Sequence, residues 1–282
     1  MITLTTAEMN TWIAALLWPL TRILGLIAAS PLFGNTSVPV SVKVSLGVLL
    51  AAIMAPAIPA LPAADPMSMA GLLILVQELL IGLAMGFVMR IVFAAIEMAG
   101  EAASLTMGLG FATFFDPQSS GRSSAVSQFL ALIATMAFLA VNAHLALLQA
   151  LAESFITMPV SATPMSAGAP FEVVRWGGRI FSAGLQLSLP VLAALLITNV
   201  ALGILTRAAP QLNIFGIGFP ITLGVGFLVL SLSMPYLGAP IQNLLNEGIE
   251  AARTVPRAGA NRAPPAAGVA KTLTPQQVTG RN

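Results

Sequence analysis

The chain has 282 residues, of which 57% are hydrophobic and 8% are charged, and its formal net charge is +2. Soluble domains carry about 25% charged residues, so the composition excludes an ordinary soluble domain and predicts a polytopic membrane protein. The absence of cysteine excludes a disulfide framework, a thiolate metal site and a cysteine nucleophile. The expected fold is all-α, with about six long apolar helical segments, some of them bent, at residues 12–33, 42–60, 67–98, 125–151, 180–205 and 214–237.

The first apolar segment, residues 12–33, carries Trp12 and Trp18 where aromatic rings favour a membrane interface. Pro19 and Arg22 interrupt it. An arginine is unfavourable against lipid, so Arg22 is expected to face protein or water. It could equally extend its charged group to the membrane interface, and the residues alone leave both readings open.

The third segment, residues 67–98, is too long for one perpendicular span at a rise of 1.5 Å per residue, so it must tilt, bend or leave the membrane. Glu78, Gly82, Gly86 and Arg90 recur every four residues on one stripe of this helix. Small residues beside charges predict a face that packs against protein rather than lipid. A structural ion pair is the favoured role of Glu78, and a proton relay is the alternative.

The sequence GLGFATFFDP, which follows the third segment, is apolar but too rich in glycine and proline for a spanning helix. Irregular backbone within a membrane must be buried in protein or line a cavity. The segment is therefore either a plug that closes a pore or a re-entrant loop packed under neighbouring helices, and the residues alone favour the packed loop. Asp116 or Ser119 is a candidate cap of the next helix. The candidate plug residues are Gly108, Gly110, Phe111, Phe114, Phe115, Asp116 and Pro117.

The fourth segment, residues 125–151, contains Asn142 and His144. These two polar residues could form a relay, but a lone histidine in an apolar helix is more often a hydrogen-bonded packing residue. The connection over residues 153–179 is rich in proline, alanine and serine and is expected to be a solvent-exposed loop.

The last two apolar segments are joined by RAAPQLNIFGIGFPITL, which begins at Arg207. Pro210 favours a turn, and Pro220 predicts that the final segment is kinked or starts late. A short amphipathic helix is expected over residues 238–253. The basic tail, residues 254–282, has little to bury and is expected to be disordered and cytoplasmic.

No constellation typical of catalysis is present: there is no Walker lysine, no cluster of histidines for a metal and no GxSxG motif. The sequence therefore predicts no enzymatic activity, no catalytic or metal-ligating residue and no cofactor. The two remaining possibilities are a helical membrane protein that conducts a substrate and one that forms the scaffold of a conducting complex.

Two of these stretches, GLGFATFFDP and RAAPQLNIFGIGFPITL, resemble the signature regions of the FliR family of type III secretion export-gate proteins. The stretch WPLTRILGLIAASPLFGNTSVPVSVKVSLG resembles the opening of the family, and the resemblance extends over about residues 10–245. The family tends to show Asn-Gly-His in the fourth segment, whereas this chain has Ala143 between Asn142 and His144, which weakens a special role for that site. IGFPITL is more similar to the flagellar branch than to the virulence branch.

The resemblance implies an export-gate subunit that assembles with FliP, FliQ and FlhB, and also with FlhA, in the bacterial inner membrane at the flagellar basal body. Unfolded flagellar proteins would pass through this gate, driven by the proton-motive force. The segment from Gly108 to Pro117, called the aromatic loop below, would plug its channel. No nucleic-acid partner is expected. Alternatives are a virulence homologue, a small-solute transporter, which would require an internal repeat, and an intramembrane enzyme, which would require a partner for His144. The residues expected to pack against other subunits are Glu78, Gly82, Gly86, Arg90, Arg207, Pro210, Gln211, Asn213, Phe215 and Pro220.

Overall fold

The computed structural model describes residues 6–59, 62, 64–111, 123–209 and 214–260, and all regular structure within them is helical. Each of the six expected apolar segments contains helix, so the predicted all-α fold is confirmed. The elements are α1 Thr6–Ala29, α2 Val40–Met54, η1 Ala55–Ala57, α3 Met69–Thr106, η2 Leu109–Phe111, α5 Ala125–Ala140, α6 Ala143–Thr157, α7 Gly168–Gly177, α8 Arg179–Ala208 and α9 Ile214–Gly259.

Four stretches in the described part of the chain are long and apolar enough to cross a membrane: Val40–Ala57, Met69–Thr106, Gly168–Ala208 and Gly216–Gly259. The pair α5 and α6 would make a fifth span if its two bent halves act as one. The apolar part of α1, Ile13–Ala29, is shorter than a usual span. The expectation of about six spans is therefore reduced to four or five by the lengths of the helices.

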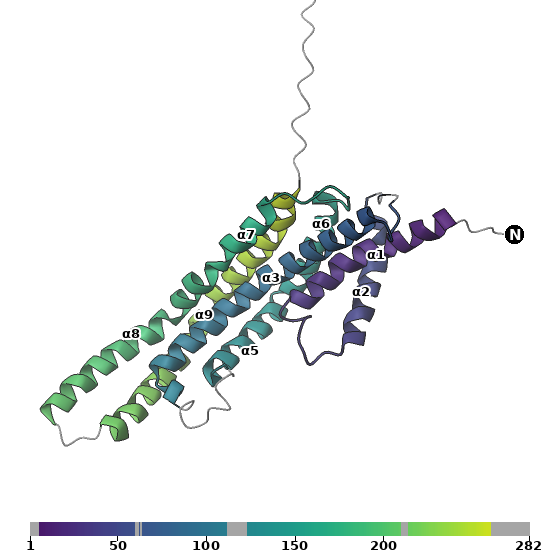
Figure 1. The fold of residues 1–282 in the computed structure, drawn as a ribbon. Helices are drawn as coiled ribbons and strands as arrows, with labels where there is room; N and C mark the ends of the chain where they lie inside the picture. Colours follow the sequence, from purple (N-terminus) through teal and green to yellow (C-terminus); the bar gives the residue numbers. More distant parts are fainter. Residues whose placement is uncertain (1–5, 60–61, 63, 112–122, 210–213, 261–282) are drawn as a thin grey trace, which may run out of the picture.

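Helix α3 is the central element, with α1, α5, α7, α8 and α9 all packed along it (Figure 1). It continues eight residues beyond the predicted end at residue 98 and has 38 residues in one helix. At 1.5 Å per residue this length is roughly 57 Å, nearly twice the hydrocarbon thickness of a bilayer. Its buried side chains, among them Ile81, Met85 and Met89, form the middle of the main hydrophobic core.

The predicted fourth segment, residues 125–151, is one of the bent segments, because it divides into α5 and α6. The chain bends by 66° between α5 and α6. The break lies at Asn142, whose φ of 56° is in the left-handed region that asparagine tolerates better than most residues. The apolar pattern continues across the break, so hydropathy alone does not reveal it.

Three expectations for the C-terminal half are corrected by the structure. Residues 153–179, expected as an exposed loop, include the end of α6 and all of α7. The amphipathic helix expected at residues 238–253 is part of the 46-residue α9, which contains Pro220 and three further prolines. Helix α9 also includes residues 254–259 of the expected disordered tail, because buried side chains such as Val255 hold them against the core. Residues 261–282 lie outside the described part of the chain.

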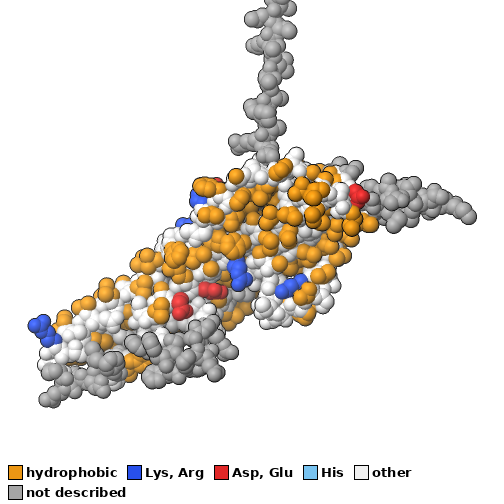
Figure 2. Space-filling model, viewed as in Figure 1, with side chains coloured by type: hydrophobic (Ala, Val, Ile, Leu, Met, Phe, Trp, Pro, Cys, Tyr) orange, Lys and Arg blue, Asp and Glu red, His pale blue; other side chains and the backbone are white. Residues whose placement is uncertain are grey.

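The surface is largely apolar, and Figure 2 shows hydrophobic side chains over much of the visible face with few charges among them. Exposed large side chains are frequent on α8, for example Phe181, Ile197 and Ile204. In the most apolar stretch of Gly168–Ala208, only 11% of the residues are buried within the chain. In the most apolar stretch of α3, the buried share is 61%. Helix α3 is thus an internal helix of this chain, whereas α8 offers its faces to lipid or to other proteins.

Candidate functional site

A buried ion pair joins α1 to α3 at the end of the molecule where α3 begins. Arg22 Nε donates to Glu78 Oε2 at 2.7 Å, and Arg22 Nη2 donates to Glu78 Oε1 at 2.9 Å. Both side chains are fully buried. Of the two readings of Arg22, the one in which it faces protein is confirmed. Glu78 forms the ion pair that the sequence analysis favoured, with a partner that is on another helix and 56 residues away.

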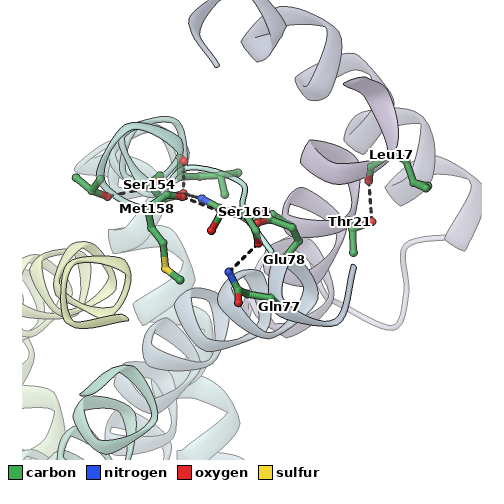
Figure 3. Close-up of polar contacts among 10 residues, drawn as sticks. Leu17, Thr21, Gln77, Glu78, Ser154, Met158 and Ser161 are labelled. Atoms are coloured by element: carbon green, nitrogen blue, oxygen red, sulfur yellow. Dashed lines mark hydrogen bonds and ion pairs between the residues drawn. The ribbon is translucent and has the colours of Figure 1, made fainter. Parts of the chain in front are cut away.

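Helix α6 completes the surroundings of the guanidinium group. Arg22 Nη1 donates to Ser154 Oγ at 3.1 Å, and Nη2 donates to the Met158 carbonyl oxygen at 3.0 Å (Figure 3). The ring of Phe155 lies 4.3 Å from the Arg22 Cζ atom, as in a cation–π contact. A buried guanidinium needs such partners for its N–H groups, and here α3 and the C-terminal end of α6 supply them.

The small-residue stripe of α3 is occupied by α1 of the same chain. A Cβ atom added at Gly82 would overlap the Arg22 carbonyl oxygen, and one added at Gly86 would lie 2.7 Å from the Leu26 carbonyl oxygen. Gly25 of α1 is in reciprocal contact, since its Cβ would lie 2.8 Å from the Leu79 carbonyl oxygen. The predicted packing face therefore exists and its observed contact is intramolecular. Arg90, the fourth residue of the stripe, is exposed.

The polar pair of the fourth segment divides into two structural roles. Asn142 is the left-handed residue at the break between α5 and α6. His144 packs against Phe138 with 6.3 Å between the ring centroids, and its buried Nδ1 has no hydrogen-bond partner among the described residues. The ring contact agrees with the packing part of the predicted role of His144, whereas Nδ1 makes no hydrogen bond within the described part of the chain.

The aromatic loop leaves α3 from a residue that α9 holds. Met107, which follows the last residue of α3, is fully buried. Thr222 Oγ1 of α9 donates to the Met107 carbonyl oxygen at 3.3 Å, and a Cβ atom added at Gly226 would lie 2.5 Å from Met107 Cγ. The chain then turns at Gly108, whose φ of 89° is a conformation that glycine adopts without strain.

The described chain resumes at Ser123, before the start of α5, and here α3 supplies the contacts. Glu101 Oε2 accepts a hydrogen bond from the Ser124 backbone N–H at 3.1 Å. Ser127 Oγ donates to the Glu97 carbonyl oxygen at 2.9 Å. Ser124 is the N-cap residue of α5, because its Oγ accepts from the Ser127 N–H at 3.2 Å. The expectation that Asp116 or Ser119 caps this helix was therefore wrong.

The remaining plug candidates are only partly within the described residues. Gly110 and the backbone of Phe111 belong to η2. Phe114, Phe115, Asp116 and Pro117, together with the Phe111 side chain, lie outside the described residues. What the structure supplies is thus the base of the loop, with one end held by α9 and the other by α3.

The end of α8 and the start of α9 lie at the same end of the molecule as this base (Figure 1). Arg207 is exposed in the last turn of α8, where a positive charge complements the helix dipole. Pro220 is exposed within α9. Pro210, Gln211 and Asn213 and the side chain of Phe215 lie outside the described residues. The ends of α6 and α9 lie at the opposite end of the molecule, beside the start of α7.

The described residues contain no group of three His, Asp or Glu side chains placed to hold a metal ion. The polar groups that they do bring together, at Arg22 and at Glu101, bind parts of the chain to one another. The geometry is therefore that of a helical scaffold, in which α9 holds Met107 and α3 holds Ser124.

Comparison of the sequence with known proteins relates this chain to export proteins. A sequence model of the family described as bacterial export proteins, family 1, matches residues 13–248. The flagellar biosynthetic protein FliR of Pectobacterium carotovorum subsp. carotovorum is 43% identical over 247 residues, which cover 88% of this chain and 94% of that protein. The FliR protein of Escherichia coli (strain K12) is 39% identical with the same coverage. That of Bacillus subtilis (strain 168) is 31% identical over 83% of this chain and 91% of its own length.

Proposed function

The chain belongs to family 1 of the bacterial export proteins, the family of flagellar biosynthetic protein FliR, and we propose that it is a subunit of the gate through which unfolded flagellar proteins are exported. The family assignment makes it a component of the flagellar export apparatus, and its long apolar helices make it a membrane protein. We propose that the chain itself forms part of the path of the exported proteins and catalyses no reaction.

The proposed partners are FliP, FliQ and FlhB, with FlhA as a further one. The exposed apolar faces support an assembly of this kind, because much of α8 and of Val40–Ala57 is left unburied within the chain. Such a surface requires either lipid or other apolar helices. Arg207 and Pro220 are proposed to contact these partners near the loop end of the molecule, since both are exposed there. The same proposal extends to Arg90 on α3 and, by sequence position, to Pro210, Gln211, Asn213 and Phe215.

The plug is proposed to be the segment from Gly108 to Pro117. The observation that carries this proposal is the base of the loop: Gly108 turns the chain away from the end of α3, and the chain returns at Ser124 against the same helix. A loop with its two ends fixed to one scaffold projects its aromatic residues at one place. Aromatic side chains in a narrow channel exclude water and ions and so keep a membrane barrier closed.

We propose that the gate lies in the inner membrane with the basic tail in the cytoplasm. Arg262, Lys271 and Arg281 follow α9 without an acidic residue among them, which is the charge bias of cytoplasmic segments. The end of α9 lies opposite the base of the aromatic loop (Figure 1). In this orientation the loop is on the side of the molecule away from the cytoplasm, so exported chains reach it last.

The experiment that tests the proposal combines co-purification with conductance. The chain is tagged at its C-terminus and purified with the neighbouring export-gate proteins, and the complex is reconstituted in planar bilayers with and without a deletion of Gly110 to Phe115. We expect a stable complex that is closed when intact and conducts ions after the deletion. An assembled deletion complex that conducts no more than the intact one would refute the plug. A chain that purifies alone and transports a small solute would refute the gate.

A further inference from the structure

The exposed side of α3 carries two opposite charges that have no partner within the described residues. Arg90 and Glu97 are two helical turns apart, which places them on one face of the helix and about 10.5 Å apart at 1.5 Å per residue. Both are exposed, and neither side chain makes an ion pair or a hydrogen bond in the described part of the chain. Glu101, one turn further along, differs because its carboxylate accepts from the Ser124 N–H.

Apolar side chains accompany these two charges along the same side of α3. Phe87 lies one turn before Arg90 and is 48% exposed, and Leu80, two turns before Phe87, is 48% exposed as well. Leu105 follows Glu97 by about two turns and is 60% exposed. We call this side, with Leu80, Phe87, Arg90, Glu97 and Leu105, the α3 stripe. It is an apolar surface with one positive and one negative charge.

Two other helices of the chain border the α3 stripe without covering it. A Cβ atom added at Gly100 would lie 2.5 Å from the Ser127 Cα atom of α5. A Cβ atom added at Gly184 of α8 would lie 2.9 Å from the Ala95 carbonyl oxygen. Helices α5 and α8 therefore touch α3 closely on its two flanks, and α3 lies between them (Figure 1).

Neither lipid nor water alone suits this combination of side chains. In lipid, an exposed arginine or glutamate without a partner is unfavourable. In water, exposed leucine and phenylalanine side chains next to the apolar surface of α8 would form a large apolar patch. Both difficulties are removed by a protein surface that is itself apolar and carries a charge opposite to each of the two on α3.

We propose that the α3 stripe binds an apolar helix of a neighbouring gate subunit, which places an acidic side chain against Arg90 and a basic one against Glu97. This inference rests on the proposed function and deepens it, because it gives the location and the chemistry of one contact between subunits. The two charges on the partner helix are about two turns apart, as they are on α3. Pairing of both charges sets the register of the two helices as well as their attraction.

The pattern of charge excludes a second copy of this chain as the partner at the same height in the membrane. Two copies with the same orientation in the membrane have parallel α3 helices. Their stripes would then bring Arg90 against Arg90 and Glu97 against Glu97, and like charges in contact repel. The partner is therefore a different chain.

The first test measures how much of the neighbouring gate proteins the tagged chain retains through purification in detergent. Loss of one member of a buried charge pair weakens binding by about thirtyfold or more. We expect Arg90→Glu and Glu97→Lys each to lower retention at least about tenfold and to leave the melting temperature of the chain unchanged, since neither side chain has an ion pair within the described residues. Arg175→Glu, which reverses an exposed charge on α7, is the control and should retain its partners.

A double variant separates the order of the charges from their sum. Arg90→Glu with Glu97→Arg keeps the net charge of the stripe and exchanges its two ends, so we expect retention as low as in the single variants. Benzoylphenylalanine in place of Phe87 cross-links the purified complex on illumination, and mass spectrometry of the linked peptide identifies the facing helix. Exchanging the acidic and the basic residue of that helix should restore retention of the double variant.

The outcomes distinguish failure of this inference from failure of the proposed function. An intact chain that retains no neighbouring gate protein would overturn both. If the intact complex forms and Arg90→Glu and Glu97→Lys retain their partners fully, the stripe is no binding surface, and the proposed gate stands. Full retention by the double variant would show that only net charge matters and would overturn the charge pairing. A cross-link from position 87 to lipid only, to a second copy or within the same chain would refute the proposed partner.

Discussion

Arg22 of α1 and Glu78 of α3 form a two-pronged ion pair in which neither side chain is exposed to solvent. With Ser154 and the Met158 carbonyl oxygen as further acceptors, the guanidinium group joins α1, α3 and α6. A buried pair of this kind contributes little net stability compared with apolar residues of equal size. Removing only one of the two charges is strongly destabilising, because the remaining charge is left buried without a partner.

The first prediction concerns the difference between removing one charge of this pair and replacing both. Replacing Arg22 with Met should destabilise the chain by about 3–5 kcal/mol, since Glu78 would remain buried and unpaired. The double substitution Arg22→Met with Glu78→Leu should recover most of that loss. Thermal unfolding of the purified proteins in detergent checks both. A double variant as unstable as the single one would show that the contacts with Ser154 and Met158 matter more than the pair.

The same double variant tests the proton relay that was the alternative role of Glu78. If the pair is structural, a complex that contains the double variant should assemble and export flagellar proteins at close to the intact rate. Motility of cells that carry the variant, together with the amount of flagellin in the medium, measures this. Normal assembly without export would instead favour a relay at Glu78.

The second prediction concerns the approach of α1 to α3. Gly82→Ala should force the helices apart, because its methyl group would overlap the Arg22 carbonyl oxygen. Overpacking of this kind costs about 1–3 kcal/mol, and the melting temperature should fall. Gly203→Ala on α8 is the control, as a Cβ there has no atom within 4 Å and alanine favours a helix. A Gly82→Ala protein with an unchanged melting temperature would contradict the close contact.

How far the sequence predicts these contacts depends on whether a signal is local. The four-residue spacing of Glu78, Gly82 and Gly86 defines one face of a helix, so the packing face of α3 could be predicted. The residue that pairs with Glu78 could not be predicted, because 56 residues separate it from Arg22 and the residues alone left the environment of Arg22 open. The signal that would have indicated the pair is the presence of two opposite charges in two apolar segments, the first and the third, since each charge needs a buried partner.

The features that were missed involve single residues whose conformation depends on tertiary contacts. Asn142 interrupts a continuous apolar pattern, and only its tolerance of positive φ distinguishes it from an ordinary polar residue in a helix. Ser124 caps α5, but Asp116 and Ser119 are equally good caps by residue type. The length of α9 was missed because its prolines suggested separate helices, whereas packing of residues such as Ile241 and Val255 maintains one.

The third prediction concerns the outgoing end of the aromatic loop. Gly226→Ala should displace Met107, since the new methyl group would come within 2.5 Å of its Cγ atom. We expect a partly open gate, seen as raised conductance of the assembled complex. Gly224→Ala is the matched control, because its Cβ would have no atom within 4 Å. Equal conductance of the two variants would indicate that the position of Met107 does not determine closure.

The fourth prediction concerns assembly. Arg207 is exposed at the end of α8, so Arg207→Ala should leave the fold of the chain unchanged and lower the yield of the multi-subunit complex. The amount of co-purified partner after detergent extraction measures the effect, with circular dichroism of the isolated chain as the test of folding. Arg175→Ala, which removes a charge exposed on α7 at the other end of the molecule, serves as the control. Undiminished recovery of the complex would refute a role of Arg207 in assembly.

The last prediction concerns the end of α9. Ser166 Oγ donates to the Ala258 carbonyl oxygen at 2.6 Å, and the Ser166 N–H donates to the Gly259 carbonyl oxygen at 3.0 Å. A chain truncated after Thr254 loses both acceptors and the buried Val255, whereas one truncated after Ala260 keeps all of them. We expect the shorter chain to melt at a lower temperature and the longer one to match the full chain. The two truncated chains differ by only six residues. A difference between their melting temperatures would therefore show that these six residues contribute to the stability of the fold. Equal stability of the two would mean that the contacts of Ser166 with α9 do not hold α7 in place.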